Sequence, residues 1–299
     1  MAVRCLLLPL ALLALAASSA AVAQLEIGFY TKTCPDAEKI VRDEMAKIIA
    51  AAPSLAGPLF RFHFHDCFVR RVKAKLEAAY PGIVSCADML TLMSRDAVVL
   101  TKGPFWPVAL GRRDGRLSSA TESSDELPPA SSDVPLLAKI FVSKGLDLKD
   151  LVVLSGAHTL GTAHCLSFVD RLYNSTGESG AYGLVDPSLD SEYADKLRLK
   201  CKSFDDRAML SGMDLGSFKT FDTSYYRHVA KRRGLFRSDA ALLFDDTTRD
   251  YVQCIATGKF DGEFFKDFRA SMIKMGDVGV LTGAEGEIRK KCYAPTSVR

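Results

Sequence analysis

Two stretches around histidines contain residues whose types and spacing suit chemistry. In the first, Arg61 and His65 are four residues apart, so a helix would place them on one face. An arginine beside a histidine is a poor core pair. It suits a pocket in which the histidine moves protons and the arginine stabilises a developing negative charge. His63 would point elsewhere, as a buried hydrogen-bonding histidine. The competing interpretation is that both histidines are structural.

The second stretch, Leu154–Gly161, surrounds His158 with small residues, which leave room for a bulky flat group against the imidazole. A lone histidine in an apolar setting is more often a satisfied core residue, so this stretch alone is a weaker signal. A zinc hydrolase is disfavoured, because His63 and His65 are two residues apart and would point apart on a helix. The chain also contains no H-E-x-x-H motif.

The spacing of apolar residues predicts a mostly helical, all-α chain with little strand-like alternation. We expect Asp147 to cap a short helix through Leu154, and Asp222 to cap one that runs to Arg233 and is closed by Gly234. The other helices are expected at residues 35–52, 59–69, 85–100, 133–144, 157–168, 189–202, 247–256 and 261–275. Long polar or glycine-rich connections are expected at 111–129 and 177–187.

Composition favours an ordinary globular protein and not a nucleic-acid-binding one. The chain has 299 residues, 48% of them hydrophobic and 25% charged, with a net charge of only +3. The basic cluster at 231–233 is short and fits a solvated helix end. Large enough for a sizeable core, the chain could form one domain or two closely packed halves.

The first 23 residues have the pattern of a secretory signal peptide. A short basic start precedes an apolar run from Cys5 to Ala17, and Ala21–Ala23 provides a small-residue cleavage site before Gln24. The apolar run is too short for a membrane anchor, so we expect no membrane association. We therefore expect an exported mature protein that spans 24–299 as one domain.

Export changes the interpretation of the cysteines, because an oxidising compartment favours disulfides over metal ligands. Seven cysteines remain after cleavage, so at least one is unpaired or bonded elsewhere. The chain has no C-x-x-C pair and no C-x-x-C-H, which disfavours a zinc ribbon and a covalently attached haem. The only asparagine, Asn174, lies in an Asn-Ser-Thr sequon, consistent with surface glycosylation.

Six motifs resemble those of plant class III haem peroxidases and occur in the same order. The resemblance runs from about Gln24 to Tyr293, with one interruption. It implies a mostly helical fold in which two helical halves hold a haem b between them, and an enzyme that uses hydrogen peroxide and phenolic donors. The motifs are RFHFHDCFV, VSCADML, GRRDGR, LSGAHTLGTAHC, FDTSYY and GLFRSD.

The resemblance also assigns roles around the haem. His158 matches the axial iron ligand, and Asp239 matches the carboxylate that accepts its other ring N–H and makes it a stronger donor. Arg61 and His65 match the distal catalytic pair. Phe64 matches the distal aromatic wall, and Pro128 matches a proline that lines the donor site at the haem edge.

A proximal calcium site is implied by a second set of matches. Oxygen donors suit this hard cation, and Thr220 would contribute its backbone carbonyl. Asp222 would serve both as ligand and as helix cap. The matching residues are Thr159, Asp214, Ser217, Thr220 and Asp222.

One departure from the resemblance lies between about residues 70 and 71. There the family has a long loop that carries most of a distal calcium site, and this chain lacks that loop. Only Asp66 and the Val69 carbonyl remain, so we predict that the distal calcium site is lost. The missing segment also carries the asparagine that orients the distal histidine, and loss of such a partner typically costs about 10–100-fold.

The cysteines depart as well. The resemblance implies the disulfides Cys86–Cys292 and Cys165–Cys201. The cysteine that pairs with Cys67 in the family is deleted here. Tyr80 stands where the family has the partner of Cys34. Pairing between Cys34 and Cys67 stays open, and Cys254 has no assigned role.

Two functions compete. The intact residues Arg61, His65, His158 and Asp239 favour a monomeric, secreted haem peroxidase of the cell wall or apoplast, weakened by the missing loop. The missing loop and the unpaired cysteines favour a secreted haem-binding or cell-wall protein without peroxidase activity. The physiological reductant is not readable from the sequence.

Overall fold

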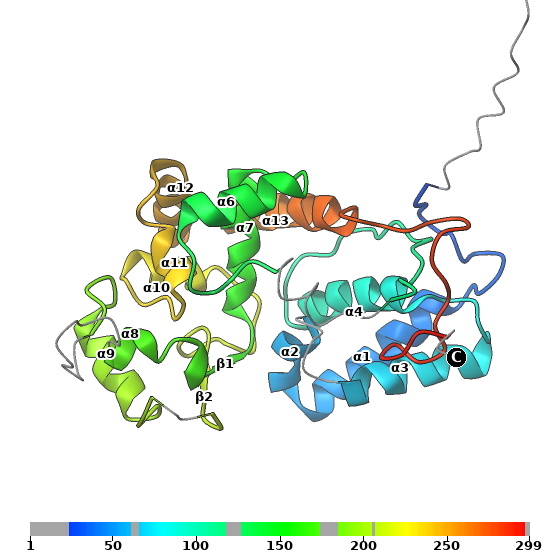
Figure 1. Ribbon diagram of the computed structural model, residues 1–299, viewed down its shortest axis with the longest axis horizontal. Coiled ribbons are helices and arrows are strands. Elements are labelled where there is room, and N and C mark those ends of the chain that lie inside the picture. The colour runs from blue at the N-terminus through cyan, green and yellow to red at the C-terminus, as the bar shows by residue number, and fades with distance from the viewer. Residues whose placement is uncertain (1–23, 61–65, 118–126, 174–184, 205–206, 297–299) are drawn as a thin grey trace, which may run out of the picture.

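The structure is a computed structural model that describes residues 24–60, 66–117, 127–173, 185–204 and 207–296. The described part is mostly helical and forms two halves, as expected (Figure 1). The first half contains α1 (Ala37–Ala51), η1 (Pro53–Leu55), α2 (Ala56–Phe60), α3 (Asp66–Ala79) and α4 (Cys86–Leu100).

The second half begins with α6 and ends with α13, after which the C-terminal segment returns to the first half (Figure 1). Within it, α7 packs against α6, α12 and α13. Its elements are α6 (Val134–Ser143), α7 (Leu148–Ser155), η2 (Gly156–Thr159), β1 (Thr162–His164), η3 (Cys165–Ser167), α8 (Asp170–Tyr173), α9 (Ser191–Arg198), β2 (Leu210–Gly212), α10 (Ser224–Ala230), α11 (Arg237–Ala241), α12 (Asp246–Ala256) and α13 (Asp261–Gly276).

Side-chain caps start several helices where the sequence predicts. The Ser85 hydroxyl accepts a hydrogen bond from the Asp88 N–H at the start of α4, and Asp133 accepts one from Leu136 N–H at the start of α6. Asp147 and Asp150 form a reciprocal capping box on α7. These local interactions fix where the helices begin.

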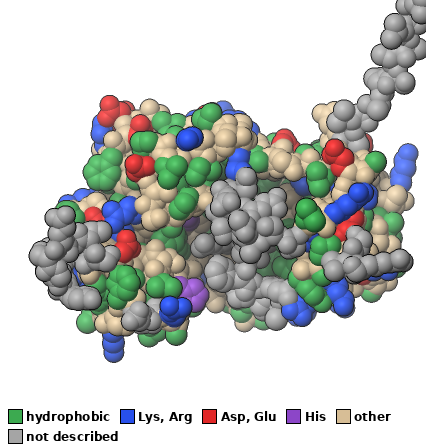
Figure 2. Space-filling model, in the orientation of Figure 1, with side chains coloured by type: hydrophobic (Ala, Val, Ile, Leu, Met, Phe, Trp, Pro, Cys, Tyr) green, Lys and Arg blue, Asp and Glu red, His purple; other side chains and the backbone are tan. Residues whose placement is uncertain are grey.

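A large hydrophobic core extends through both halves. It includes Val41 of α1, Met93 of α4, Val153 of α7 and Phe268 of α13, all fully buried. A smaller cluster lies under α8 and α9, around Phe168. On the face shown in Figure 2, the described hydrophobic and charged side chains are mixed over both halves.

Three predicted helices differ from the structure. The helix expected from Asp222 to Arg233 is shorter, because α10 spans Ser224–Ala230 and Arg232, with a φ of +58°, leaves helical geometry before Gly234. The helix predicted at 157–168 is replaced by η2, β1 and η3, because Gly161 has a φ of +92° that ends helical geometry. β1 then pairs antiparallel with β2. The helix predicted at 59–69 has the wrong C-terminal boundary: α3 continues to Ala79. Residues 61–65 of that prediction lie outside the described residues.

The two halves approach each other backbone to backbone between α2 and the segment after η2. A Cβ atom added to Gly57 of α2 would lie 2.3 Å from the Gly161 Cα, so only glycine fits there. Gly161 follows His158 by three residues. This contact therefore joins α2 of the first half to the His158 region of the second.

Candidate active site

His158 lies in η2, directly after α7, and its ring is fixed by a buried carboxylate from α11. The Nδ1 atom of His158 lies 2.8 Å from Oδ1 of Asp239, whose side chain is only 2% exposed. A carboxylate can only accept, so Nδ1 carries the proton and Nε2 keeps its lone pair. Asp239 also accepts hydrogen bonds from the Tyr225 hydroxyl and the Phe236 N–H, each at 2.8 Å.

These contacts keep Asp239 charged. Burial alone would raise the pKa of Asp239, but attraction to the His158 ring opposes this effect. The hydrogen bonds from His158, Phe236 and Tyr225 act in the same direction, so the pKa stays below its ordinary value. An ionised Asp239 makes the imidazole a stronger electron donor, which is how such pairs tune haem iron.

The surroundings of His158 fit a haem. No described residue bonds its Nε2, and its side chain is 35% exposed. Phe236 and Tyr225 contact the ring edge-on, with centroid distances of 5.2 and 5.8 Å. A neutral imidazole that is rigidly held and has a free Nε2 is the usual axial ligand of haem iron.

Arg61, Phe64 and His65, which the sequence analysis expects on the distal side, lie outside the described residues. The chain enters this segment from α2 and leaves it into α3, in the half that lies across from α7 (Figure 1). Asp66 is the first residue of α3, and the Val69 carbonyl lies within the same helix. Pro128 is exposed, beyond the undescribed residues 118–126.

The residues expected to bind calcium gather at one point. The Thr159 hydroxyl, itself fully buried, lies 3.0 Å from Oδ2 of Asp214 and 3.4 Å from Oδ1 of Asp222. It also lies 3.5 Å from the Thr220 carbonyl oxygen, and the Ser217 hydroxyl donates to Asp222. All five predicted residues therefore come together.

One atom in this cluster favours a cation. Oδ1 of Asp214 is buried and has no hydrogen-bond partner among the described residues; it makes an ion-pair contact of 3.1 Å with Nε2 of His228. No described group of three or more His, Cys, Asp or Glu side chains is arranged as a metal site. That finding does not oppose calcium here, because most donors are hydroxyl and carbonyl oxygens.

Two residues of the cluster were missed by sequence reasoning. The Ser224 hydroxyl bonds both Asp214 and Asp222, and the Ser224 N–H donates to Asp222 at 2.7 Å. His228 approaches Asp214 from the next turn of α10. The sequence contained one signal for Ser224. In the spacing Asp222-x-Ser224, a short side chain at the start of a helix can reach back to the Asp222 carboxylate.

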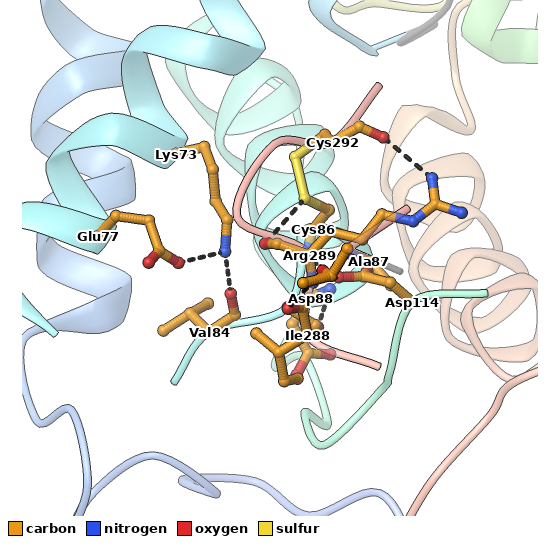
Figure 3. Close-up of a disulfide and its surroundings, with 12 residues drawn as sticks. Lys73, Glu77, Val84, Cys86, Ala87, Asp88, Asp114, Ile288, Arg289 and Cys292 are labelled. Atoms are coloured by element: carbon orange, nitrogen blue, oxygen red, sulfur yellow. Dashed lines mark hydrogen bonds and ion pairs between the residues drawn. A yellow bond between two sulfur atoms is a disulfide. The ribbon is translucent and has the colours of Figure 1, made fainter. Parts of the chain in front are cut away.

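Both disulfides that the resemblance implies, Cys86–Cys292 and Cys165–Cys201, are formed. Around Cys86, the Asp114 carboxylate accepts from the N–H groups of Cys86, Ala87 and Arg289 (Figure 3). Among the described cysteines, Cys34 is free and buried, and Cys254 is free and exposed. The side chain of Cys67 lies outside the described part.

Comparison with known proteins identifies the class. Residues 69–258 match the family model described as "Peroxidase". The chain is 54% identical to Peroxidase 1 of Oryza sativa subsp. japonica, over 94% of this chain and 96% of that protein. It is 48% identical to Peroxidase 3 of Arabidopsis thaliana, over 92% of this chain and 93% of that protein. The chain belongs to the peroxidase family, among the plant class III haem peroxidases.

The alignments are longer than the chain. The alignment with the rice protein spans 314 positions, yet 94% of this 299-residue chain is only about 281 residues. About 33 of the 314 positions therefore have no residue here. This difference agrees with a segment that the relatives contain and this chain lacks. Of the helices in the described ranges, none is long and apolar enough to cross a bilayer.

Proposed function

We propose that this haem peroxidase oxidises small phenolic donors with hydrogen peroxide, at a site formed by His158 and Asp239 on one side and Arg61 and His65 on the other. Each peroxide takes up two electrons and two protons and becomes two water molecules. Two phenols each lose one electron and one proton. Haem b held by His158 would supply the redox chemistry that connects these two half-reactions.

The observation that carries this proposal is the His158–Asp239 pair. Its 2.8 Å hydrogen bond fixes the ring and leaves Nε2 available for iron. On the distal side, His65 takes a proton from peroxide and returns it to the departing oxygen. Arg61 stabilises the negative charge that develops as the O–O bond breaks. Phe64 limits the pocket, and Pro128 contacts the donor.

The missing segment lowers the activity in this proposal without abolishing it. His65 loses the asparagine that orients it, and an effect of about 10–100-fold is typical for such a loss. The chain holds one calcium ion, bound by the cluster around Asp214, while Asp66 and the Val69 carbonyl are too few to hold a second. The protein acts as a monomer in the cell wall or apoplast, after removal of residues 1–23.

The test is an absorption spectrum of the haem-loaded protein before and after one equivalent of hydrogen peroxide. We expect a ferric Soret band that changes on peroxide addition and returns when a small phenol is added. A ferric spectrum that peroxide leaves unchanged would contradict the distal roles of Arg61 and His65. It would instead support the alternative of a haem-binding protein without activity. A protein that takes up no haem would contradict the site as a whole.

The matched pair of variants is His158→Ala and His164→Ala. His164 is a second histidine of the same region, in β1. We expect His158→Ala to lose the ferric Soret band and His164→Ala to keep it. Equal haem binding by both variants would remove His158 from the role of axial ligand.

A further inference from the structure

Three tyrosine rings form a continuous line of contacts that begins at His158 and ends at the surface. The ring centroids of His158 and Tyr225 are 5.8 Å apart, and those of Tyr225 and Tyr226 are 5.1 Å apart. The next step, from Tyr226 on α10 to Tyr251 on α12, is 5.8 Å. Tyr225 and Tyr226 are buried, whereas Tyr251 is partly exposed. Each pair is in edge-to-face contact, close enough for direct electron exchange between rings.

The three hydroxyls differ in what could accept their protons. Tyr225 donates to Oδ1 of Asp239, an oxygen that already accepts from His158. Tyr226 donates to the Val152 carbonyl at 3.0 Å, and a carbonyl cannot hold a proton near neutral pH. Tyr251 donates to Oδ2 of Asp267 at 3.1 Å. Only Tyr251 has a carboxylate that is not already committed to the axial histidine.

This difference decides where an oxidised tyrosine would persist. Burial, together with the nearby acids at Tyr225 and Tyr251, raises the pKa of all three phenols, so each is protonated at neutral pH. A protonated phenol that loses an electron becomes strongly acidic, and it stays oxidised only if a partner in hydrogen-bond reach takes its proton. An oxidised tyrosine is therefore transient at position 226 and persists as a neutral radical at position 251.

The end of the line is open to solvent. The side chain of Asp267 on α13 is 20% exposed and pairs at 2.9 Å with Lys149 of α7, which is 58% exposed. A proton taken by Asp267 can thus exchange with water. Cys254, exposed and free, lies one helical turn after Tyr251 on α12. A ring at this position can meet a donor that is too large to enter a pocket beside His158.

We propose that Tyr251 is a second oxidation site, which takes one electron at a time from phenol groups attached to a polymer. It rests on the proposed function, because peroxide reduction at the haem supplies the oxidising equivalents. One electron leaves Tyr251 through Tyr226 and Tyr225, and its phenolic proton passes to Asp267. The polymer-bound phenol then gives one electron and one proton, which restore Tyr251. The electron and the proton that Tyr251 released are the ones that end in the water formed from peroxide.

The experiment traps the radical and locates it. Haem-loaded protein carrying Cys254→Ser, which removes the competing thiol, receives one equivalent of peroxide and a nitroso spin trap. The adducts are then assigned by peptide mass spectrometry. In a second arm, protein loaded with zinc protoporphyrin is illuminated with a sacrificial electron acceptor, so that the porphyrin draws electrons from the protein without peroxide. We expect an adduct on Tyr251 in both arms.

The variants separate the route from the end point. Tyr226→Phe keeps the ring but removes the intermediate that can be oxidised, and we expect loss of the Tyr251 adduct. Asp267→Asn keeps a hydrogen-bond acceptor but cannot take the proton, and we expect the same loss. Tyr173→Phe is the matched control, since its hydroxyl bonds the Cys201 carbonyl away from the line. It should leave the adduct unchanged.

Donor oxidation gives a second readout. We expect Tyr251→Phe to lose the oxidation of dextran-coupled tyramine and to keep that of a small free phenol. A Tyr251 adduct in the illuminated zinc protoporphyrin sample but not in the peroxide-treated haem sample would overturn the proposed function and support the tyrosine route. Bound porphyrin without a Tyr251 adduct in either arm would overturn the route, as would an adduct that survives Tyr226→Phe. Failure to bind any porphyrin would overturn both.

Discussion

At the scale of single residues, the clearest feature is a buried carboxylate oxygen that accepts no hydrogen bond from a described residue and has His228 Nε2 at 3.1 Å. Asp214 is fully buried, yet its Oδ1 receives no hydrogen bond from a described residue. A buried polar atom without a partner costs about 1–3 kcal/mol, and a charged one costs more. The surrounding hydroxyls and the Thr220 carbonyl are oxygen donors that suit calcium, and a calcium ion bound among them would satisfy Oδ1 directly.

We therefore expect calcium to raise the unfolding temperature of the protein, and chelation by EGTA to lower it. A ligand at 100 times its dissociation constant stabilises the folded state by about 2.7 kcal/mol. Asp214→Asn should remove the response to calcium, while Asp133→Asn, at an exposed helix cap, should keep it. Differential scanning calorimetry and a calcium titration check both points. Two calcium ions per chain would contradict the loss of the distal site.

At the scale of elements, α3 shows how the chain closes over the missing segment. Arg70 and Arg71, between which the family loop is absent, lie inside one continuous helix from Asp66 to Ala79. The buried residues Val69, Val72 and Leu76 follow helical spacing across this point, so the apolar face continues without a break. The sequence analysis predicted a helix that ends at Val69, whereas α3 continues to Ala79.

Proline at position 71 tests the continuity of α3. Arg71→Pro removes a helical hydrogen bond and clashes with the preceding turn, which costs about 3 kcal/mol or more in a helix interior. Arg71→Ala, the control, loses only the 2.9 Å contact with Glu44. Urea unfolding followed by circular dichroism measures the two. Equal stability of the variants would mean that the chain forms a loop at this point.

The contact of α7 with α13 depends on Asp150. Its side chain, 3% exposed, accepts hydrogen bonds from Ser271 at 2.7 Å and from Lys274 at 2.9 Å. Burial alone would raise the pKa of Asp150. The Asp147 N–H, Lys274 and Ser271 outweigh burial and hold the pKa below its ordinary value. Asp150 therefore stabilises the fold above its unfolded pKa of about 3.9, and this contribution is lost as the pH falls through the lower folded value.

Asp150→Ala should accordingly destabilise the protein by about 1–3 kcal/mol at pH 7, because the buried Ser271 hydroxyl loses its acceptor. The difference from the unmodified protein should shrink as the pH is lowered below about 4. Asp246→Ala removes an exposed carboxylate paired with Arg249 and should change stability little at either pH. Urea unfolding at several pH values gives the comparison. A difference that stays constant down to pH 2 would be against this role.

The elements also show where prediction from sequence succeeds. Caps such as Asp133 and Asp147 act within one turn, so the sequence locates those helix starts. The residues after His158 read as a helix, but their structure depends on Gly161, which bonds Phe218 and Met213 far along the chain. Long-range contacts of this kind override local preference.

At the scale of the whole molecule, the site combines residues that are distant in sequence. His158 and Asp239 are 81 residues apart, and no local rule predicts their hydrogen bond. Motif resemblance predicted that pair, and it named five residues as calcium ligands that the structure brings together. Ser224 lies within the FDTSYY motif but was assigned no role there, and none of the six motifs contains His228. The structure does not describe Arg61, Phe64 and His65, so their roles stay predictions.

Cross-links act at the same scale. Cys86–Cys292 joins residues 206 positions apart and ties the C-terminal segment to the first half, whereas Cys34 has lost its family partner. Tyr80→Cys should restore a disulfide with Cys34 and stabilise the protein by about 2–4 kcal/mol. Tyr80→Ser is the control, since it also loses the bond to Asp36. Urea unfolding measures the change in stability. Thiol counting tests the disulfide itself, because free thiols at both 34 and 80 would show that the pair cannot form.

The glycine contact between the halves has a mechanical consequence. Gly57 and Gly161 meet backbone to backbone, so no rotatable side chain separates them and nothing there can adapt by changing rotamer. The contact therefore sets how closely α2 can approach the loop that follows His158. Any side chain larger than a hydrogen atom at position 57 would push α2 away from that loop, and the spacing between the two halves would change with it.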